Sequence, residues 1–117
     1  MKKSLLFLPV LIAAATPAHA TGGMVCKTAG RRPVEVSMVI GHTIGSPLVS
    51  ARMTEGGRSS DVRAAQWWLD ASELRLLLVD PQATRPELTL KAKKNGRFYD
   101  GMLVRFGRSR WVRCREG

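Results

Sequence analysis

The sequence predicts an all-β protein, a small eight-stranded, up-and-down antiparallel barrel or sandwich whose terminal strands are linked by a disulfide. Eight short apolar runs alternate with clusters of turn-forming residues at a spacing of roughly 8–12 residues, which is typical of such folds. The dipeptide Asn95-Gly96 lies between two alternating runs and is the strongest short-range hairpin signal. Cys26 lies in the first run and Cys114 in the last, so a bond between them would join the two ends of the domain.

The first 20 residues are expected to be a cleaved secretory signal peptide, which leaves one small domain over residues 21–117. A basic start is followed by an apolar run over residues 5–15 and then by Ala18-His19-Ala20, which fits a signal-peptidase site. The apolar run is shorter than the roughly 20 residues that a membrane-spanning helix needs. We therefore expect a periplasmic or secreted bacterial protein with no transmembrane segment in its mature part.

The two cysteines both lie within the expected mature chain, and an even pair in a small exported domain is most simply a disulfide. In the chain-entropy account, closing so long a loop stabilises the fold by about 4–5 kcal/mol. No Cys-x-x-Cys motif is present, and His42 is the one histidine of the mature chain. The sequence therefore shows neither a redox motif nor zinc-ligand spacing, and we expect no cofactor and no metal.

Three strands are expected in the first part of the mature chain. Residues 24–27 form a short strand that carries Cys26, and residues 34–40 alternate with period 2, as a half-buried strand does. Residues 48–54 form a third strand after a loop that contains Gly and Pro. Residues 55–61, rich in Gly and Ser, are expected to be a loop.

The segment 61–69 fits two structures. As a strand it places Trp67 and Trp68 on opposite faces, and as a short helix it would be capped by Ser60 or Asp61. The surrounding β pattern and the β-propensity of tryptophan favour the strand.

Four more strands complete the predicted fold, at residues 74–79, 88–93, 98–106 and 109–115. Asn95-Gly96 is expected to form a type I′ turn, and Gly107-Arg108 a type II′ turn with glycine at its first central position. Tight hairpins favour an up-and-down order. In that order the last strand pairs with the first and the sheet keeps no exposed edge.

The positive charge is concentrated at the C-terminal end of the sequence. The formal charge is +10, and removing Lys2 and Lys3 with the signal peptide leaves +8. Residues 91–117 hold nine basic and two acidic residues, a net charge of +7. A field of this sign attracts anionic partners and affects association more than folding.

The last strands are therefore expected to form a cationic sheet face. We expect the apolar alternate residues of the seventh strand, Phe98, Met102, Val104 and Phe106, to face the core, together with Val112 and Cys114 of the eighth. The residues between them then face outward, where basic side chains interleaved with aromatic rings suit anionic polymers. The predicted binding residues are Lys91, Lys93, Tyr99, Arg105, Trp111, Arg113 and Arg115.

No residue pattern indicates catalysis. His42 lies in a glycine-rich loop without an acidic neighbour in sequence, and most carboxylates lie in expected turns, where they bond to the backbone. Asp100 is the exception, because it alternates with residues expected to be buried. It is expected to point inward and to pair with Arg110 on the next strand, since a buried carboxylate needs a partner.

A small exported barrel closed by a disulfide between its terminal strands, from Cys26 to Cys114, resembles the periplasmic inhibitors of C-type lysozyme. The resemblance implies a Ser-Gly-x-x-Tyr loop that enters the lysozyme cleft. Here Ser59-Ser60 is followed by Asp61-Val62-Arg63, without that Gly and Tyr. Lysozymes of this type are basic and would meet a repulsive field from a chain of charge +8.

The sequence as a whole predicts a non-enzymatic binding module of the cell envelope. Its expected partner is an anionic envelope polymer or an acidic protein, held on the cationic face. The alternatives are an inhibitor of a host hydrolase such as lysozyme and a small-ligand barrel of the lipocalin kind.

Overall fold

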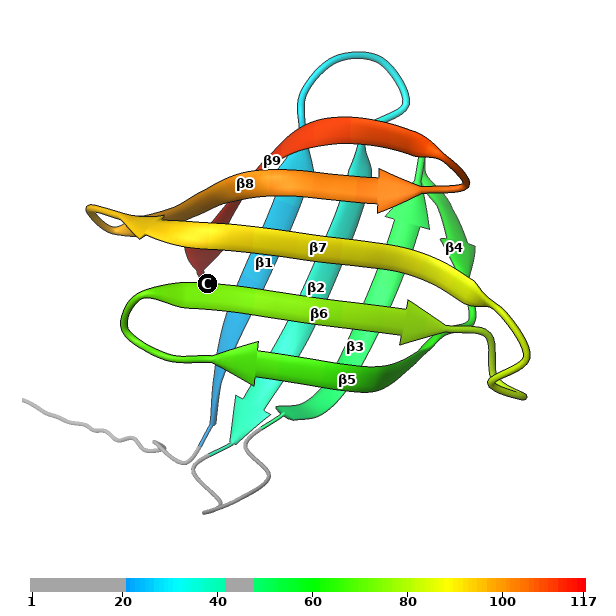
Figure 1. The fold of residues 1–117 in the computed structure, drawn as a ribbon, viewed down its shortest axis with the longest axis horizontal. Helices are drawn as coiled ribbons and strands as arrows, with labels where there is room; N and C mark the ends of the chain where they lie inside the picture. The colour runs from blue at the N-terminus through cyan, green and yellow to red at the C-terminus, as the bar shows by residue number, and fades with distance from the viewer. Residues whose placement is uncertain (1–20, 42–47) are drawn as a thin grey trace, which may run out of the picture.

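The computed structural model describes residues 21–41 and 48–117, and these residues form one antiparallel sheet without a helix (Figure 1). Residues 1–20, which are expected to be a signal peptide, and His42 lie outside the described residues. The strand order is β4-β3-β2-β1-β9-β8-β7-β6-β5. The strands are β1 (Thr21–Thr28), β2 (Val34–Gly41), β3 (Leu48–Glu55), β4 (Arg58–Ser60), β5 (Arg63–Leu69), β6 (Glu73–Val79), β7 (Pro86–Asn95), β8 (Phe98–Arg105) and β9 (Arg108–Glu116).

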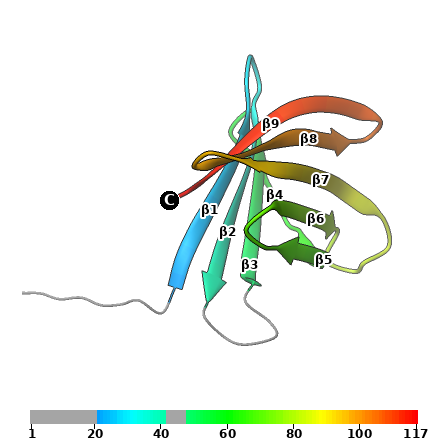
Figure 2. The same ribbon diagram turned by 60° about the vertical axis from the view of Figure 1, so that its left-hand side comes forward.

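The sheet curls into a half-barrel whose two halves face each other across the core. Strands β5–β9 form the front layer in Figure 1 and β1–β4 lie behind them, and Figure 2 shows the same layers from the side. Neighbours in the sheet are consecutive in sequence except β1 and β9, which confirms the up-and-down order and the pairing of the first strand with the last. The predicted loss of every edge is wrong, because β4 and β5 each have one neighbour.

Alternate side chains of each strand fill the space between the two layers. Apolar residues pack there because burying a Leu, Val or Met side chain stabilises the fold by about 1.5–3 kcal/mol. Both layers contribute to this core. Its buried members are Met24, Cys26, Val34, Val36, Met38, Met53, Leu74, Leu76, Leu78, Leu88, Leu90, Ala92, Tyr99, Leu103, Val112 and Cys114.

The predicted disulfide is confirmed. Cys26 of β1 lies directly opposite Cys114 of β9, and their sulfur atoms are bonded. Both side chains are fully buried, and they are 88 residues apart in sequence. The bond therefore fastens the one seam of the sheet that does not follow the order of the chain.

Strands β5 and β4 lie in the two segments whose structure the sequence left ambiguous or assigned to a loop. The ambiguous segment is a strand, β5, as the surrounding pattern favours. The loop expected over residues 55–61 contains a ninth strand, β4, because Gly56 and Gly57 adopt φ values of 59° and 85° and turn the chain back on β3. Glycine adopts such values without the steric cost that other residues incur.

Both predicted hairpins exist, but each turn lies one residue away from the predicted position. Asn95 pairs with Phe98, so the first turn is Gly96-Arg97, with glycine at a φ of 64° in the first central position, as in type II′. Arg105 pairs with Arg108, so the second turn consists of two residues before Arg108. These are Phe106 at 49° and Gly107 at 77°, both positive as in type I′.

The predicted inner face of β8 is wrong. Met102 is 45% exposed and Phe106 is 63% exposed, whereas Tyr99 and Leu103 are buried. The reason is the register of β8 on β7. A two-residue turn pairs even-numbered positions of β7 with odd-numbered positions of β8, so Leu90 of the core lies opposite Leu103 and the odd-numbered residues of β8 face inward. Phe98 and Val104, which were also expected inside, share the outward set with Met102.

Gly101 marks the place where β8 approaches β7 most closely. A Cβ atom there would lie 1.9 Å from the Lys91 carbonyl oxygen and 2.6 Å from the Ala92 Cα. Glycine at such a position lets two backbones approach and the sheet bend. Because the obstructing atoms belong to the backbone, no side-chain rotation relieves the clash.

We expect Gly101→Ala to lower the free energy of unfolding by about 2–3 kcal/mol, since β7 and β8 must separate locally. Urea unfolding followed by circular dichroism measures this loss. Gly22→Ala is the matched control, because no atom lies within 4 Å of a Cβ built there. Equal stability of the two variants would contradict the close approach.

Candidate functional site

Five of the seven predicted binding residues lie on the outer face of the front layer, the face directed away from the core. Met102 lies opposite both Lys91 and Trp111, and Asp100 lies opposite both Lys93 and Arg113. Arg115 follows on the same side of β9. All five side chains are exposed, as predicted: Lys91, Lys93, Trp111, Arg113 and Arg115.

The other two, Tyr99 and Arg105, were expected on this face but point inward. Tyr99 is 5% exposed, and its hydroxyl donates a hydrogen bond to the carbonyl oxygen of Asp70 at 2.7 Å. The Arg105 side chain is 13% exposed. Both follow the inward set of β8 that the register imposes, so neither can contribute to an outer binding face.

Arg105 instead holds an internal ion cluster at one end of the half-barrel. Its guanidinium pairs with Glu55 of β3 and, at 3.2 Å, with Glu87 of β7. Arg85 pairs with the second oxygen of Glu87 at 3.1 Å. The ring of Phe106, which occupies a turn position with positive φ, lies 4.7 Å from the guanidinium carbon. The cluster links the back layer to the front layer.

A row of charged residues crosses the outer face and is largely neutralised within itself. We call Glu73, Lys93, Asp100 and Arg113 the ion-pair row, because each lies opposite the next on neighbouring strands. Arg113 donates two hydrogen bonds to the carboxylate of Asp100, at 2.8 and 2.9 Å.

The expected inward Asp100–Arg110 pair is therefore wrong, because the β8 register turns Asp100 outward toward Arg113. Arg110 donates instead to the carbonyls of Ala29, Arg31 and Arg32.

These hydrogen bonds change the acidity of Asp100. The guanidinium of Arg113 and the amide of Asn95 lower the pKa of Asp100 from 3.8 to about 2. The same pairing raises the pKa of Arg113. A carboxylate with a lowered pKa stabilises the fold above its unfolded-state pKa, and this contribution is lost as the pH falls toward 2.

We therefore expect the free energy of unfolding to fall between about pH 4 and pH 2. This fall is expected to be smaller in Asp100→Asn, because the variant lacks the carboxyl group that titrates. Asp80, whose pKa is lowered to about 2 by hydrogen bonds from Thr84 and Arg85, keeps a similar dependence in the variant. The measurement is the denaturant midpoint of both proteins at pH 5, 3 and 2. Parallel curves would contradict the role of the Asp100–Arg113 pair.

A second row on the same face combines aromatic and cationic side chains and contains no acid. Its members lie opposite one another on five successive strands, β5 to β9. Adjacent strands are about 4.8 Å apart, so the row is about 19 Å long. We call it the Trp68–Trp111 row, and it consists of Trp68, Arg75, Lys91, Met102 and Trp111.

The indole rings at the two ends are held in place. The Trp68 Nε1 atom donates to Asp70 at 2.8 Å, and the guanidinium carbon of Arg75 lies 5.4 Å from the Trp68 ring. The guanidinium of Arg113 lies 5.3 Å from the Trp111 ring. Hydrogen bonds from Ser72, Glu73 and Trp68 hold the pKa of Asp70 well below its usual range, so the carboxylate that anchors Trp68 stays ionised. The rings are thus exposed yet oriented.

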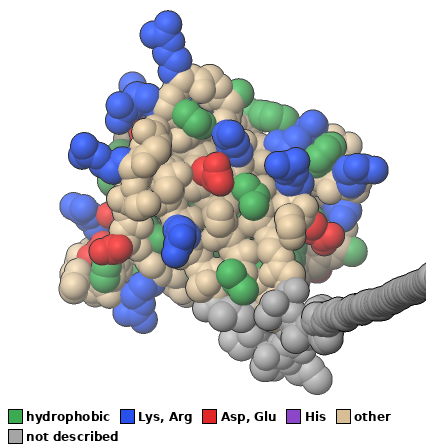
Figure 3. All heavy atoms as spheres, turned by 180° about the vertical axis from the view of Figure 1, so that it is seen from behind, with side chains coloured by type: hydrophobic (Ala, Val, Ile, Leu, Met, Phe, Trp, Pro, Cys, Tyr) green, Lys and Arg blue, Asp and Glu red, His purple; other side chains and the backbone are tan. Residues whose placement is uncertain are grey.

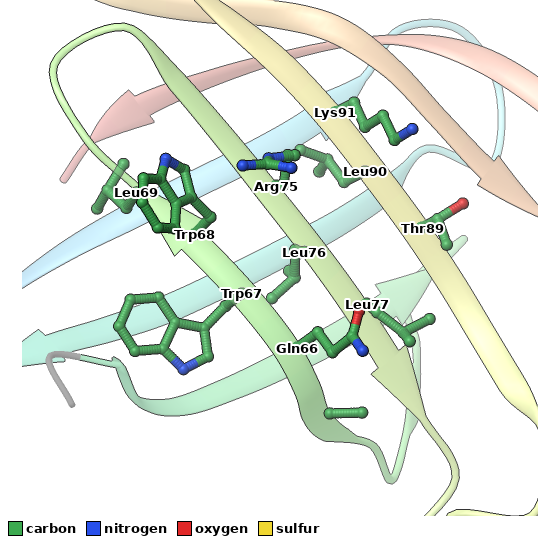
Figure 4. A pocket seen from close by; sticks show the side chains of 11 residues that line it. Gln66, Trp67, Trp68, Leu69, Arg75, Leu76, Leu77, Thr89, Leu90 and Lys91 are labelled. Atoms are coloured by element: carbon green, nitrogen blue, oxygen red, sulfur yellow. The ribbon is translucent and has the colours of Figure 1, made fainter. Parts of the chain in front are cut away.

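A shallow hollow adjoins one end of the row. It is lined by residues of β5, β6 and β7, and Figure 4 shows Trp68 beside Arg75, with Lys91 on the next strand. Trp67 leaves the same strand in a different direction and packs against the core with Leu76. Figure 3 shows the opposite side of the molecule, where basic, acidic and hydrophobic side chains are interspersed.

The sequence pointed to Lys91 and Trp111 but missed the other members of this row. Trp68 was noted, but the strand assignment placed it only on the face opposite Trp67 and did not predict which of the two rings faces outward. Arg75 and Met102 carried no signal, since only the pairing of five strands places them in line. Met102 was expected in the core.

No protein-family model, no curated protein and no solved structure matches this chain. Ser59 and Ser60, which were compared above with the Ser-Gly-x-x-Tyr loop of the lysozyme inhibitors, lie in the edge strand β4. Within residues 21–41 and 48–117, no three His, Cys, Asp or Glu side chains gather as metal ligands would. No helix long and apolar enough to cross a membrane occurs in the same residues.

Proposed function

We propose that this protein is an exported, non-enzymatic binding module that holds an anionic partner of the cell envelope against the outer face of β5–β9. Its expected mature charge of +8 favours such a partner at long range. A buried disulfide between terminal strands suits an oxidising compartment outside the cytoplasm.

The Trp68–Trp111 row is the observation that carries this proposal. Asp100 is occupied by Arg113, so the ion-pair row offers little net charge to a partner. In the Trp68–Trp111 row, Lys91 has no acidic neighbour directly opposite on either adjoining strand, and Arg75 meets Glu73 at 3.4 Å in an exposed pair. Exposed pairs of this kind are weak, so both cations are available to anionic groups.

The proposal is tested by titrating residues 21–117 with heparin and with polyphosphate at several salt concentrations. Binding is expected to weaken steadily as salt rises, because condensed counterions are released on binding. The variant Arg75→Gln/Lys91→Gln is expected to bind about 30-fold more weakly, because it loses two contacts at about 1 kcal/mol each.

The matched control is Arg52→Gln/Arg58→Gln, which removes the same charge from the exposed surface of β3 and β4. It is expected to bind nearly as well as the unchanged protein. An equal loss in both variants would show that net charge alone governs binding, and an absence of binding at low salt would refute the proposal.

A further inference from the structure

We propose that the anionic partner is a lipid bilayer with anionic headgroups, and that the Trp68–Trp111 row lies in its interfacial layer. The inference rests on the proposed function and specifies its ligand. Three kinds of observation support it: the apolar side chains of the row, its cations, and its placement on an open face.

The apolar members of the row are too exposed and too well aligned for a purely ionic site. Trp68 is 49% exposed, Met102 is 45% exposed and Trp111 is 50% exposed. Five large hydrophobic side chains are exposed within the described residues, and three of them lie in this one row. Single exposed hydrophobic residues need no explanation, but a group of them marks an interaction surface.

The identity of these side chains favours a lipid over a polymer. Tryptophan is enriched at membrane interfaces, where its ring is apolar and its N–H remains hydrated. Met102 lies in line with the rings but has no flat face on which a sugar or a base could stack. Its flexible thioether chain adapts instead to disordered apolar surroundings such as the upper acyl region.

The cations are placed where headgroup phosphates would lie. Arg75 and Lys91 occupy adjacent strands between the apolar ends of the row. Long basic side chains keep their apolar stems along the surface while the charged ends reach the headgroup level. The Arg75 guanidinium can also donate two parallel hydrogen bonds to one phosphate.

The shape of the face suits a partner larger than the protein. The row crosses the broad front layer from edge strand β5 to β9, as the strand arrangement in Figure 1 shows. Because Trp68 and Trp111 are already oriented by Asp70, Arg75 and Arg113, little side-chain freedom is lost when they enter an interface.

Flotation with vesicles provides the first test. Vesicles containing phosphatidylglycerol are expected to carry the protein, whereas pure phosphatidylcholine vesicles carry little. Trp68→Ala/Trp111→Ala is expected to reduce partitioning at least tenfold, and the difference from the unchanged protein should persist at 0.5 M salt, where surface charges are screened (about 4 Å Debye length). Val39→Ala, an exposed apolar side chain on β2 that is 42% exposed, is the control and should have no effect.

Quenching by brominated lipids provides the second test, because it reports which rings enter the bilayer. Three variants that each retain one tryptophan, with phenylalanine at the other two positions, are compared on the same anionic vesicles. Trp68 and Trp111 are expected to be quenched and Trp67, which packs toward the core, is expected to be protected. Circular dichroism confirms that each variant is folded.

The outcomes separate this inference from the function on which it rests. Binding to heparin without binding to vesicles would overturn the lipid inference and leave the anionic binding module standing. Vesicle binding that is unchanged in Trp68→Ala/Trp111→Ala, or equal quenching of all three rings, would also overturn it. Binding to neither heparin nor vesicles would refute both.

Discussion

Replacing Arg105 by methionine is expected to lower the free energy of unfolding by about 3 kcal/mol. The change leaves two carboxylates at the end of the half-barrel without their shared cation, and breaking a buried ion pair by removing one partner costs about 3–5 kcal/mol. The Glu87 side chain is 7% exposed, but Glu55 is 28% exposed and can recover some hydration. The loss is therefore expected near the lower end of that range.

Urea unfolding at pH 7 measures this loss, and two further variants identify its cause. Arg113→Met breaks a pair whose arginine is 43% exposed, and exposed pairs contribute at most about 1 kcal/mol. Adding Glu55→Gln and Glu87→Gln to Arg105→Met removes the two carboxylates that lose Arg105, of which Glu87 keeps a pair with the exposed Arg85, and should restore part of the stability. If Arg105→Met were no more harmful than Arg113→Met, the ion cluster would not hold the two layers together.

Removing the disulfide is expected to cost a similar or larger amount. In the chain-entropy account, a bond that closes an 88-residue separation contributes about 4–5 kcal/mol. Cys26→Ala/Cys114→Ala should lose that contribution and some packing, because both sulfur atoms are buried in the core. Small domains are stable by about 5–15 kcal/mol in total, so the variant should unfold at markedly lower temperature.

Thermal unfolding with and without a reductant checks this result. The reductant should lower the melting temperature of the unchanged protein toward that of Cys26→Ala/Cys114→Ala and should leave the variant unaffected. Hydrogen exchange at β1 and β9 should accelerate in the variant before exchange elsewhere in the sheet. Equal melting temperatures of the two oxidised proteins would contradict a stabilising role for the bond.

Much of the fold could be predicted because its signals are local. Period-2 alternation and turn residues identify nearly every strand, and two cysteines in the outermost strands indicate the seam. The strand β4 was missed because three polar residues after a glycine pair carry no alternation. The open edges were missed because closure of the barrel depends on whether β4 and β5 pair with each other, and neither strand's sequence indicates this.

The inner face of β8 was mispredicted by weighing hydrophobicity strand by strand. Phe98, Met102 and Val104 form a more apolar set than their neighbours, yet they face outward. A two-residue turn joins positions of opposite parity, so inward Leu90 on β7 and inward Val112 on β9 both require odd-numbered inward residues on β8. The sequence contained this information, since both flanking strands were assigned correctly.

The candidate site was harder to predict for a different reason. Its five residues come from five strands, and each of those strands has a clear pattern only for its buried side. Outward positions carry no periodic signal that relates one strand to the next. The cationic character of the face was predictable from charge counts, whereas the row that concentrates its apolar side chains required the register.

The pairing of β1 with β9 also determines how the chain could be circularly permuted. The N–H of Gly117 donates to the carbonyl of Gly23 at 3.0 Å, so the two ends of the sheet-forming segment lie side by side. The edges β4 and β5 are joined by the short connection at Asp61-Val62. A circular permutant that links residue 117 to residue 21 and begins at Val62 would keep every strand pair, while its new termini would fall at the two free edges. Its nine strands would then follow one another in sequence order, and the disulfide would span a short hairpin instead of nearly the whole domain.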